Sequence, residues 1–149
     1  MENRYLCRGK RIDNGEWVKG NLIQSCDATD GWETIIIPVK NSNMFTKHIK
    51  HGYGNLGFEN WYRVDPSTIC QCTGLRDKNG KLIWENDIME GHLDEEHPED
   101  VTRTRVLWYE NGWYTKEIGS IDYEPLSDFD SENFEVIGNM IDNPELLEE

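Results

Sequence analysis

The sequence has no long hydrophobic stretch. A membrane-spanning helix needs about 18 or more consecutive apolar residues, and the longest candidate here is the short segment from Thr34 to Val39. The first residues, MENRYLCRGKR, include basic side chains but no apolar segment after them, so we expect no secretory signal. These absences predict a protein without membrane contact that stays in the cytoplasm.

Several familiar catalytic and nucleotide-binding motifs are also missing. The chain contains no G-x-x-x-x-G-K-[ST], G-x-G-x-x-G, G-x-S-x-G or H-E-x-x-H. Their absence argues against the common nucleotide, hydride-transfer, acyl-transfer and metalloprotease chemistries. We assign no catalytic and no cofactor-binding residues, and we interpret the chain as a non-enzymatic protein without a cofactor.

Cysteine is scarce, and no pattern in the sequence predicts a metal site. The four cysteines are Cys7, Cys26, Cys70 and Cys72, and the four histidines are His48, His51, His92 and His97. Without a secretory signal, the reducing cytosol favours free thiols. The C-x-C of Cys70 and Cys72 lacks the two-residue spacer and the second pair of a zinc knuckle. We therefore expect free thiols and solvated histidines rather than a metal centre.

Positive charge is nearly absent from the C-terminal part of the chain. Residues 85–149 carry three Lys and Arg against twenty Asp and Glu, a net −17, whereas residues 1–84 carry twelve against nine, a net +3. Nucleic-acid backbones are bound by Lys and Arg, so the total of −14 disfavours non-specific binding to them. Such an asymmetry bears on partners and solubility rather than on fold.

Strand and turn signals dominate the first half. Residues 4–23 read as a β-hairpin around the turn cluster at Asp13 to Gly15, with Gly20 at a bulge or a close backbone approach. The β-branched segment Thr34 to Val39 predicts a buried strand near a sheet edge, because Pro38 is tolerated only at an edge or a strand end. Asn41 to Asn60 is polar and rich in glycine, and predicts a long loop.

The second half repeats this pattern around two strong turns. The Asp77 to Gly80 turn separates a strand at Thr68 to Leu75 from shorter strands, and a second hairpin at Val101 to Ile118 is expected to turn at Asn-Gly. Gly91 to Asp100 predicts a solvated acidic loop, and Phe134 to Ile137 a last strand. Pro144 to Glu149 is expected to be a helical turn or a frayed tail.

The predicted fold class is therefore mainly β with little helix. The hairpins could build either a small barrel-like domain or a two-lobed β domain. We expect a single domain over residues 1–149, with an N-terminal lobe at about 1–64 and a C-terminal lobe at about 65–149.

Three sequence blocks resemble the YopX family of phage and prophage proteins. They are RYLCRGKRIDNGEWVKGNLI, VDPSTICQCTGLRDKNGKLIWENDIM and FEVIGNMIDNPELL, which occur in the family's order. Such co-occurrence is more specific than any one short motif. The resemblance implies a phage or prophage origin, a cytoplasmic location in the host cell, a mainly β fold and symmetric self-association. It implies no catalytic residues.

Two departures from the family pattern stand in the central block. Cys70 and Cys72 occupy positions that usually hold a glycine and an aromatic residue, and Asn86 stands where a glycine usually precedes Asp87. We interpret both as local adjustments of a strand or turn.

Carboxylates in the central block invite a catalytic hypothesis. Asp65, Asp77, Glu85 and Asp87 could be a general acid and base pair or a hard-metal site. The structural alternative is better supported, because aspartate in a turn commonly accepts hydrogen bonds from the backbone.

A basic and aromatic patch near the N-terminus is the remaining candidate site. Its residues are Tyr5, Arg8, Lys10, Arg11, Trp17 and Lys19. Such patches stack single-stranded bases. Basic residues on an exposed strand also prevent edge-to-edge aggregation, which is the commoner explanation.

Two functions are compatible with these observations. The first is a non-enzymatic structural or interaction protein that forms a homo-oligomer, the acidic half of one subunit docking near the mildly basic half of another. The second is a nucleic-acid-related phage accessory protein, which either binds single strands through the N-terminal patch or imitates DNA with its acidic half.

Overall fold

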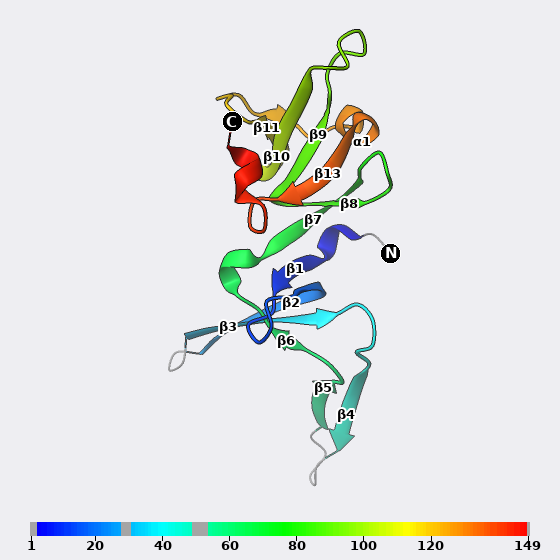
Figure 1. Cartoon of the computed structure of the whole chain (residues 1–149). Helices are drawn as coiled ribbons and strands as arrows, with labels where there is room; N and C mark the ends of the chain where they lie inside the picture. The colour runs from blue at the N-terminus through cyan, green and yellow to red at the C-terminus, as the bar shows by residue number, and fades with distance from the viewer. Residues whose placement is uncertain (1–2, 28–30, 49–53, 149) are drawn as a thin grey trace. The chain divides into compact units, whose positions relative to one another are not determined.

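The computed structural model describes residues 3–27, 31–48 and 54–148. The chain is mainly β, with 52% strand and 12% helix, as predicted (Figure 1). It divides into two compact units, one from Tyr5 to Cys70 and one that combines Met1–Arg4 with Gln71–Glu149. None of the sheets formed by the described residues closes into a barrel, so the two-lobed alternative applies rather than the barrel-like one.

The unit from Tyr5 to Cys70 is built on an antiparallel sheet with the order β6-β3-β2-β1. Its strands are β1 (Cys7–Lys10), β2 (Trp17–Asp27), β3 (Gly31–Pro38) and β6 (Tyr62–Arg63). β1 pairs with β2 from Cys7↔Gly20 to Lys10↔Trp17, which confirms the predicted hairpin. β3 ends at Pro38 and lies beside the short outer strand β6, as a buried strand near an edge should.

One face of this sheet forms the unit's core. Val18, Ile36 and Val64 are buried there and are joined by partly buried Leu22, Tyr62 and Ile69. Gly20 is needed for close approach rather than for turn geometry, because a Cβ at this position would lie 1.9 Å from the carbonyl oxygen of Ile37. The backbone contact predicted from Gly20 is therefore confirmed.

The predicted loop at Asn41 to Asn60 is wrong for residues 44–48 and 54–58. The segment forms β4 (Met44–His48) and β5 (Gly54–Phe58), which pair with each other in a separate two-stranded sheet. The pairing runs from Met44↔Phe58 to His48↔Gly54. The hairpin was missed because its strands contain glycine and polar residues instead of an alternating apolar pattern.

The second unit is built on a five-stranded antiparallel sheet with the order β12-β11-β10-β9-β13. Its strands are β9 (Asp87–His92), β10 (Val101–Tyr109), β11 (Gly112–Glu117), β12 (Glu124–Pro125) and β13 (Phe134–Asn139). The hairpin of β7 (Cys70–Arg76) and β8 (Leu82–Trp84) also belongs to this part of the chain. The unit's core consists of buried Ile83 from β8 and buried Met89, Val106 and Phe134 from the five-stranded sheet.

Short helical segments complete both units. The helix α1 (Asp128–Asn133) precedes β13 and was not predicted. The 3-10 turns are η1 (Asn3–Tyr5), η2 (Pro66–Thr68) and η3 (Pro144–Leu147), the last at the predicted position. No helix among the described residues is both long enough and apolar enough to cross a membrane.

The β10–β11 turn differs in detail from the expected Asn-Gly turn. Gly112 already pairs with Tyr109, so Glu110 and Asn111 form the connection. The left-handed conformation falls on Glu110, with φ of 54°. The hairpin itself is confirmed, with its turn one residue earlier than the Asn-Gly motif suggested.

Candidate binding surfaces

The β1–β2 hairpin gathers four of the six N-terminal patch residues on one face. Directly opposed residues of an antiparallel pair share a face, and here Arg8 opposes Lys19 while Lys10 opposes Trp17. The Arg8 guanidinium lies 4.7 Å from the centre of the Trp17 ring and the Lys10 ammonium lies 5.5 Å from it. Arg8 is only 7% exposed, which restricts its access to a phosphate. The face is basic and aromatic, as the sequence suggested, with its central cation buried.

The other two patch residues are Arg11, at the end of the hairpin strand β1, and Tyr5. Arg11 stacks on Tyr62 at 4.0 Å and forms an ion pair with Asp13 at 2.6 Å. The hydrogen bond between them raises the pKa of Arg11 and lowers the pKa of Asp13. Tyr5 belongs to η1 and is 69% exposed. Arg11 therefore contacts Tyr62 and Asp13 instead of Trp17.

Asp77 is a structural residue of the β7–β8 turn. Its Oδ1 accepts hydrogen bonds from the backbone N–H groups of Asn79 and Lys81, both at 2.9 Å, and its Oδ2 accepts one from the N–H of Val136 at 2.9 Å. The side chain is buried. All these donors are backbone amides, so the carboxylate fixes the turn.

Two other carboxylates of the central block, Asp65 and Asp87, have similar local roles. Asp65 caps η2 through Ser67, and these hydrogen bonds lower its pKa. The buried Asp87 accepts from the backbone N–H of Trp84 at 2.7 Å. Burial raises the pKa of Glu85. These contacts support the structural interpretation that the sequence favoured over a catalytic one.

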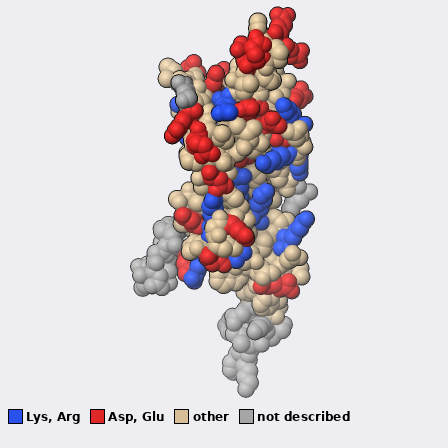
Figure 2. Space-filling model, in the orientation of Figure 1, with Lys and Arg blue, Asp and Glu red and all other residues tan. Residues whose placement is uncertain are grey.

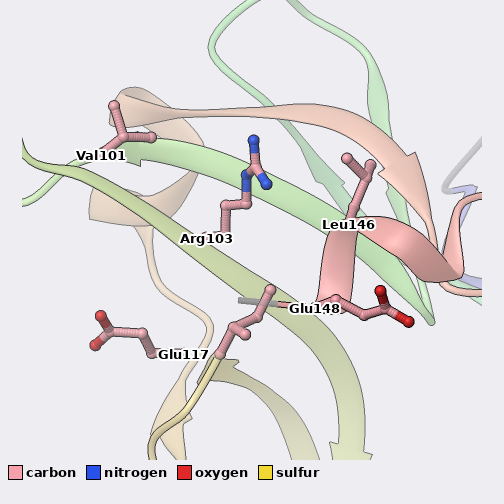
Figure 3. Close-up of a pocket in the computed structure, with 6 residues that line it drawn as sticks. Val101, Arg103, Glu117, Leu146 and Glu148 are labelled. Carbon is pink, nitrogen blue, oxygen red and sulfur yellow. The ribbon is translucent and has the colours of Figure 1, made fainter.

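A cavity of about 320 Å³ opens on the outer face of β10 and β11 (Figure 3). Val101 and Arg103 come from β10, Glu117 ends β11, and Leu146 and Glu148 come from the C-terminal segment. Figure 3 shows Arg103 between Val101 and Leu146. Its Nε donates to Glu90 at 2.8 Å, in a partly exposed ion pair. The arrangement offers an anchored guanidinium on a partly apolar surface.

The same face collects every basic residue of the acidic C-terminal stretch. Arg103, Arg105 and Lys116 are the only Lys and Arg among residues 85–149. Arg105 opposes Lys116 across the hairpin, and Arg103 lies two residues before Arg105 on the same side. Arg105 donates to the Asn86 side chain at 3.1 Å, and Lys116 lies 5.2 Å from the centre of the Tyr123 ring. The sequence signal for this grouping is the two-residue spacing of Arg103 and Arg105 in the predicted hairpin at Val101 to Ile118.

An exposed group of aromatic rings lies at the turn end of the same hairpin. Trp108 packs edge-on against Trp113 at 5.1 Å, and Tyr109 stacks on Tyr123 at 4.2 Å. Trp108 remains 51% exposed. Trp108 and Trp113 oppose each other across the two strands and share one face of the sheet, whereas Tyr109 and Tyr123 lie on the other face. The pair Trp108 and Trp113 is called the aromatic patch below.

The thiols and histidines form no evident metal centre in the part of the chain that is described. Cys7, Cys70 and Cys72 are thiols that form no disulfide bond, while the side chains of Cys26, His48 and His51 lie outside the described residues. Only His97, Glu99 and Asp100, all exposed, bring three potential ligand atoms within 4.8 Å of one another there. These three residues lie in the loop between β9 and β10, where Figure 2 shows many acidic side chains.

The fold resembles a solved structure of similar size. The crystal structure of protein EF1440 from Enterococcus faecalis superimposes with a TM-score of 0.58 at 22% sequence identity, covering 95% of this chain and 96% of that chain. At this identity the likeness shows the fold alone. Comparison with curated proteins gives no significant match.

The family assignment comes from the sequence. A family model described as YopX protein matches residues 8–148, which is nearly the whole chain and spans the three blocks that carry the resemblance, apart from the first few residues of the first block. The chain belongs to the YopX family.

Proposed function

We propose that this protein is a non-enzymatic interaction protein that forms homo-oligomers, with the β4–β5 hairpin of one copy docking on the aromatic patch of the next. The observation that carries the proposal is the hairpin itself. Two strands that pair only with each other are marginally stable in water, and normally need a third strand or a packed face. A partner surface would provide that support.

Apolar side chains occupy both faces of the hairpin. Met44 and Leu56 share one face, because Met44 opposes Phe58 and Thr46 opposes Leu56. Met44 is 64% exposed and Leu56 is 61% exposed. Phe45 lies on the other face, over Gly57, where a Cβ would meet its ring at 2.7 Å. Exposed apolar groups of this kind favour burial in an interface.

The aromatic patch is a suitable receptor for this hairpin. Trp and Tyr are enriched at interfaces, where large rings bury much area. The charges also match, since the patch belongs to the stretch with net −17 and the hairpin to the part with net +3. Contacts between two different surfaces are heterologous, and they close into a ring when the rotation permits.

Light scattering coupled to size-exclusion chromatography tests the proposal. The wild-type mass should exceed 17.5 kDa several-fold, while Leu56→Ser and Trp108→Ser should each give monomers. Mixing these two variants should restore a dimer, because each retains the surface that the other lacks. Ile12→Ser is the matched control, since Ile12 is also exposed but lies outside both surfaces.

Two results would overturn the proposal. A wild-type monomer at every protein concentration and salt would exclude self-association. Oligomers that persist in both variants would exclude these contacts.

The alternative of single-strand binding is favoured by one observation, the grouping of Lys10, Trp17 and Lys19 on one strand face. Fluorescence anisotropy with a labelled single-stranded oligonucleotide tests it. Binding that weakens as salt rises and that is lost in Lys19→Ala would support this alternative.

A further inference from the structure

A basic groove lies on the outer face of the second unit's sheet. The cavity of Figure 3, which Arg103 lines, shares Glu117 and Ile118 with a neighbouring cavity of about 340 Å³ that Arg105 and Lys116 line. Arg105 opposes Lys116 in the β10–β11 register, and Arg103 lies two residues before Arg105, so the three cations share one face. The groove, defined by these two cavities, therefore holds every Lys and Arg of the acidic C-terminal stretch.

Two of these cations form no ion pair with another described residue. Arg105 donates to the neutral side-chain amide of Asn86 at 3.1 Å, and the Lys116 ammonium lies over a tyrosine ring rather than beside a carboxylate. Arg103 pairs with Glu90 through its Nε at 2.8 Å, and its two Nη groups make no hydrogen bond with the described residues. The same stretch contains twenty carboxylates that could have neutralised these charges. The open positive face therefore favours an anion from outside the chain.

The carboxylates that border the groove are turned away from its guanidinium. Glu117 and Glu148 line the first cavity, and Figure 3 shows both carboxylate groups pointing away from the guanidinium of Arg103. Glu117 also opposes the buried Thr104 across the hairpin, so its side chain starts from the inner face of the sheet. Neither carboxylate occupies the position where an anion would meet Arg103.

The remaining walls of the groove are largely apolar. Val101, Ile118, Leu146 and Leu147 line the two cavities. A Cβ built at Gly138 would lie 3.0 Å from Leu146, so the turn η3 packs closely against β13 and forms one wall. The groove thus combines cations with apolar contact, which suits a peptide better than a small inorganic anion.

The surrounding charge limits the length of the anion. The stretch that holds the groove has a net charge of −17, so a polyanion such as single-stranded DNA would extend beyond the three cations onto an acidic surface. A short acidic peptide segment can end within the groove. In an extended chain, residues two apart lie about 7 Å from each other and point the same way. This spacing matches that of Arg103 and Arg105 on β10.

We propose that this groove binds an extended acidic segment of a partner protein, in which two carboxylates alternate with other residues and follow an apolar side chain. One carboxylate accepts hydrogen bonds from the Nη groups of Arg103, in the bidentate manner that arginine favours. The second carboxylate pairs with Lys116 beside the charge of Arg105, and the apolar side chain packs on Leu146. The groove lies on the opposite face of the sheet from the aromatic patch, so this proposal and the proposed self-association can fail independently.

Titration followed by heteronuclear NMR on the full-length protein, at constant ionic strength, tests the groove. The probes are two peptides of equal composition and charge, acetyl-Leu-Ser-Glu-Ser-Glu-amide and acetyl-Leu-Glu-Glu-Ser-Ser-amide. We expect saturable shifts at the amides of Arg103, Arg105 and Lys116. The alternating peptide should bind about threefold tighter or more, because only its spacing places both carboxylates on one side of an extended chain.

Two variants and a control make the result decisive. Lys116→Gln should weaken binding about fivefold, as expected for the loss of one partly exposed charge pair. Glu148→Gln should tighten binding about twofold, because it removes a negative charge from the border of the groove. Lys81→Gln removes an equal charge from an exposed residue that lines neither cavity, and should bind normally.

The proposal is overturned if neither peptide gives saturable shifts at these amides, or if the alternating peptide binds no more tightly than the other. It is also overturned if Lys81→Gln weakens binding as much as Lys116→Gln does. A single-stranded oligonucleotide that binds at the same amides more tightly than the alternating peptide would identify the groove as a nucleic-acid site instead.

Discussion

The carboxylate of Asp77 holds the N–H of Val136 at 2.9 Å, joining the β7–β8 turn to strand β13, 59 residues later in the sequence. The same carboxylate organises its own turn through Asn79 and Lys81. One side chain therefore specifies both a local turn and a long-range contact, which explains why an aspartate in the family's central block can be essential to the fold without being catalytic.

Replacing Asp77 should be strongly destabilising. Asp77→Ala leaves three backbone N–H groups without their acceptor, and should lower the free energy of unfolding by about 3 kcal/mol. Urea denaturation followed by tryptophan fluorescence measures this change. Glu95→Ala, in an exposed loop, should change the value by less than about 0.5 kcal/mol. Equal effects of the two substitutions would contradict the assigned role.

The cost of replacing Gly80 should depend only on how readily the new residue adopts a positive φ. Its φ is 82°, and nothing lies within 4 Å of a Cβ built there, so a substitution meets strain but no collision. Gly80→Val should destabilise by roughly 1–2 kcal/mol, whereas Gly80→Asn should lose less, since asparagine visits the left-handed region more readily. Thermal melting can rank these variants against exposed Lys78→Ala, which should remain near wild type. An unchanged melting temperature for Gly80→Val would exclude the turn geometry.

Two carboxyl groups should give opposite pH dependences. Burial raises the pKa of Glu85 above 4.5, so its contribution to stability is present below that pH and is lost as the pH rises through the folded-state value. Hydrogen bonds from Ser67 lower the pKa of Asp65 below 3.8, so its contribution is present above that pH and is lost as the pH falls.

The measurement is the free energy of unfolding of the wild type minus that of Glu85→Gln or Asp65→Asn, determined at several pH values from acid to neutral. The difference should fall with rising pH for Glu85→Gln and rise for Asp65→Asn. Slopes of the same sign would show that one of the two assignments is wrong.

The thiols should differ in reactivity. Cys70 and Cys72 are fully buried, while Cys7 is partly exposed, so a thiol reagent should modify Cys7 first in the native protein. The unfolded protein should release four titratable thiols without reductant, including Cys26. A chelator should leave the melting temperature unchanged. Stoichiometric zinc, or native Cys70 that reacts as fast as in the unfolded chain, would contradict these expectations.

Asn86 shows how one departure from the family pattern fits the structure. It stands before Asp87 with φ of 69°, in the left-handed region where glycine is usual and asparagine is the best tolerated alternative. Its side chain accepts a hydrogen bond from Arg105. The substitution therefore keeps the backbone geometry and adds a contact that glycine could not make.

The sequence by itself determined the mainly β class, the hairpins at residues 4–23 and 101–118, and the Asp77 to Gly80 turn. These features depend on neighbours a few residues apart, where turn chemistry and side-chain alternation act directly. Only the tertiary structure decided that residues 44–48 pair with residues 54–58, that Arg11 contacts Tyr62 instead of Trp17, and that Glu117, Asp130 and Thr104 line one cavity. These groupings depend on strand register and on loops that bring distant residues together, and a local sequence pattern carries no information about either.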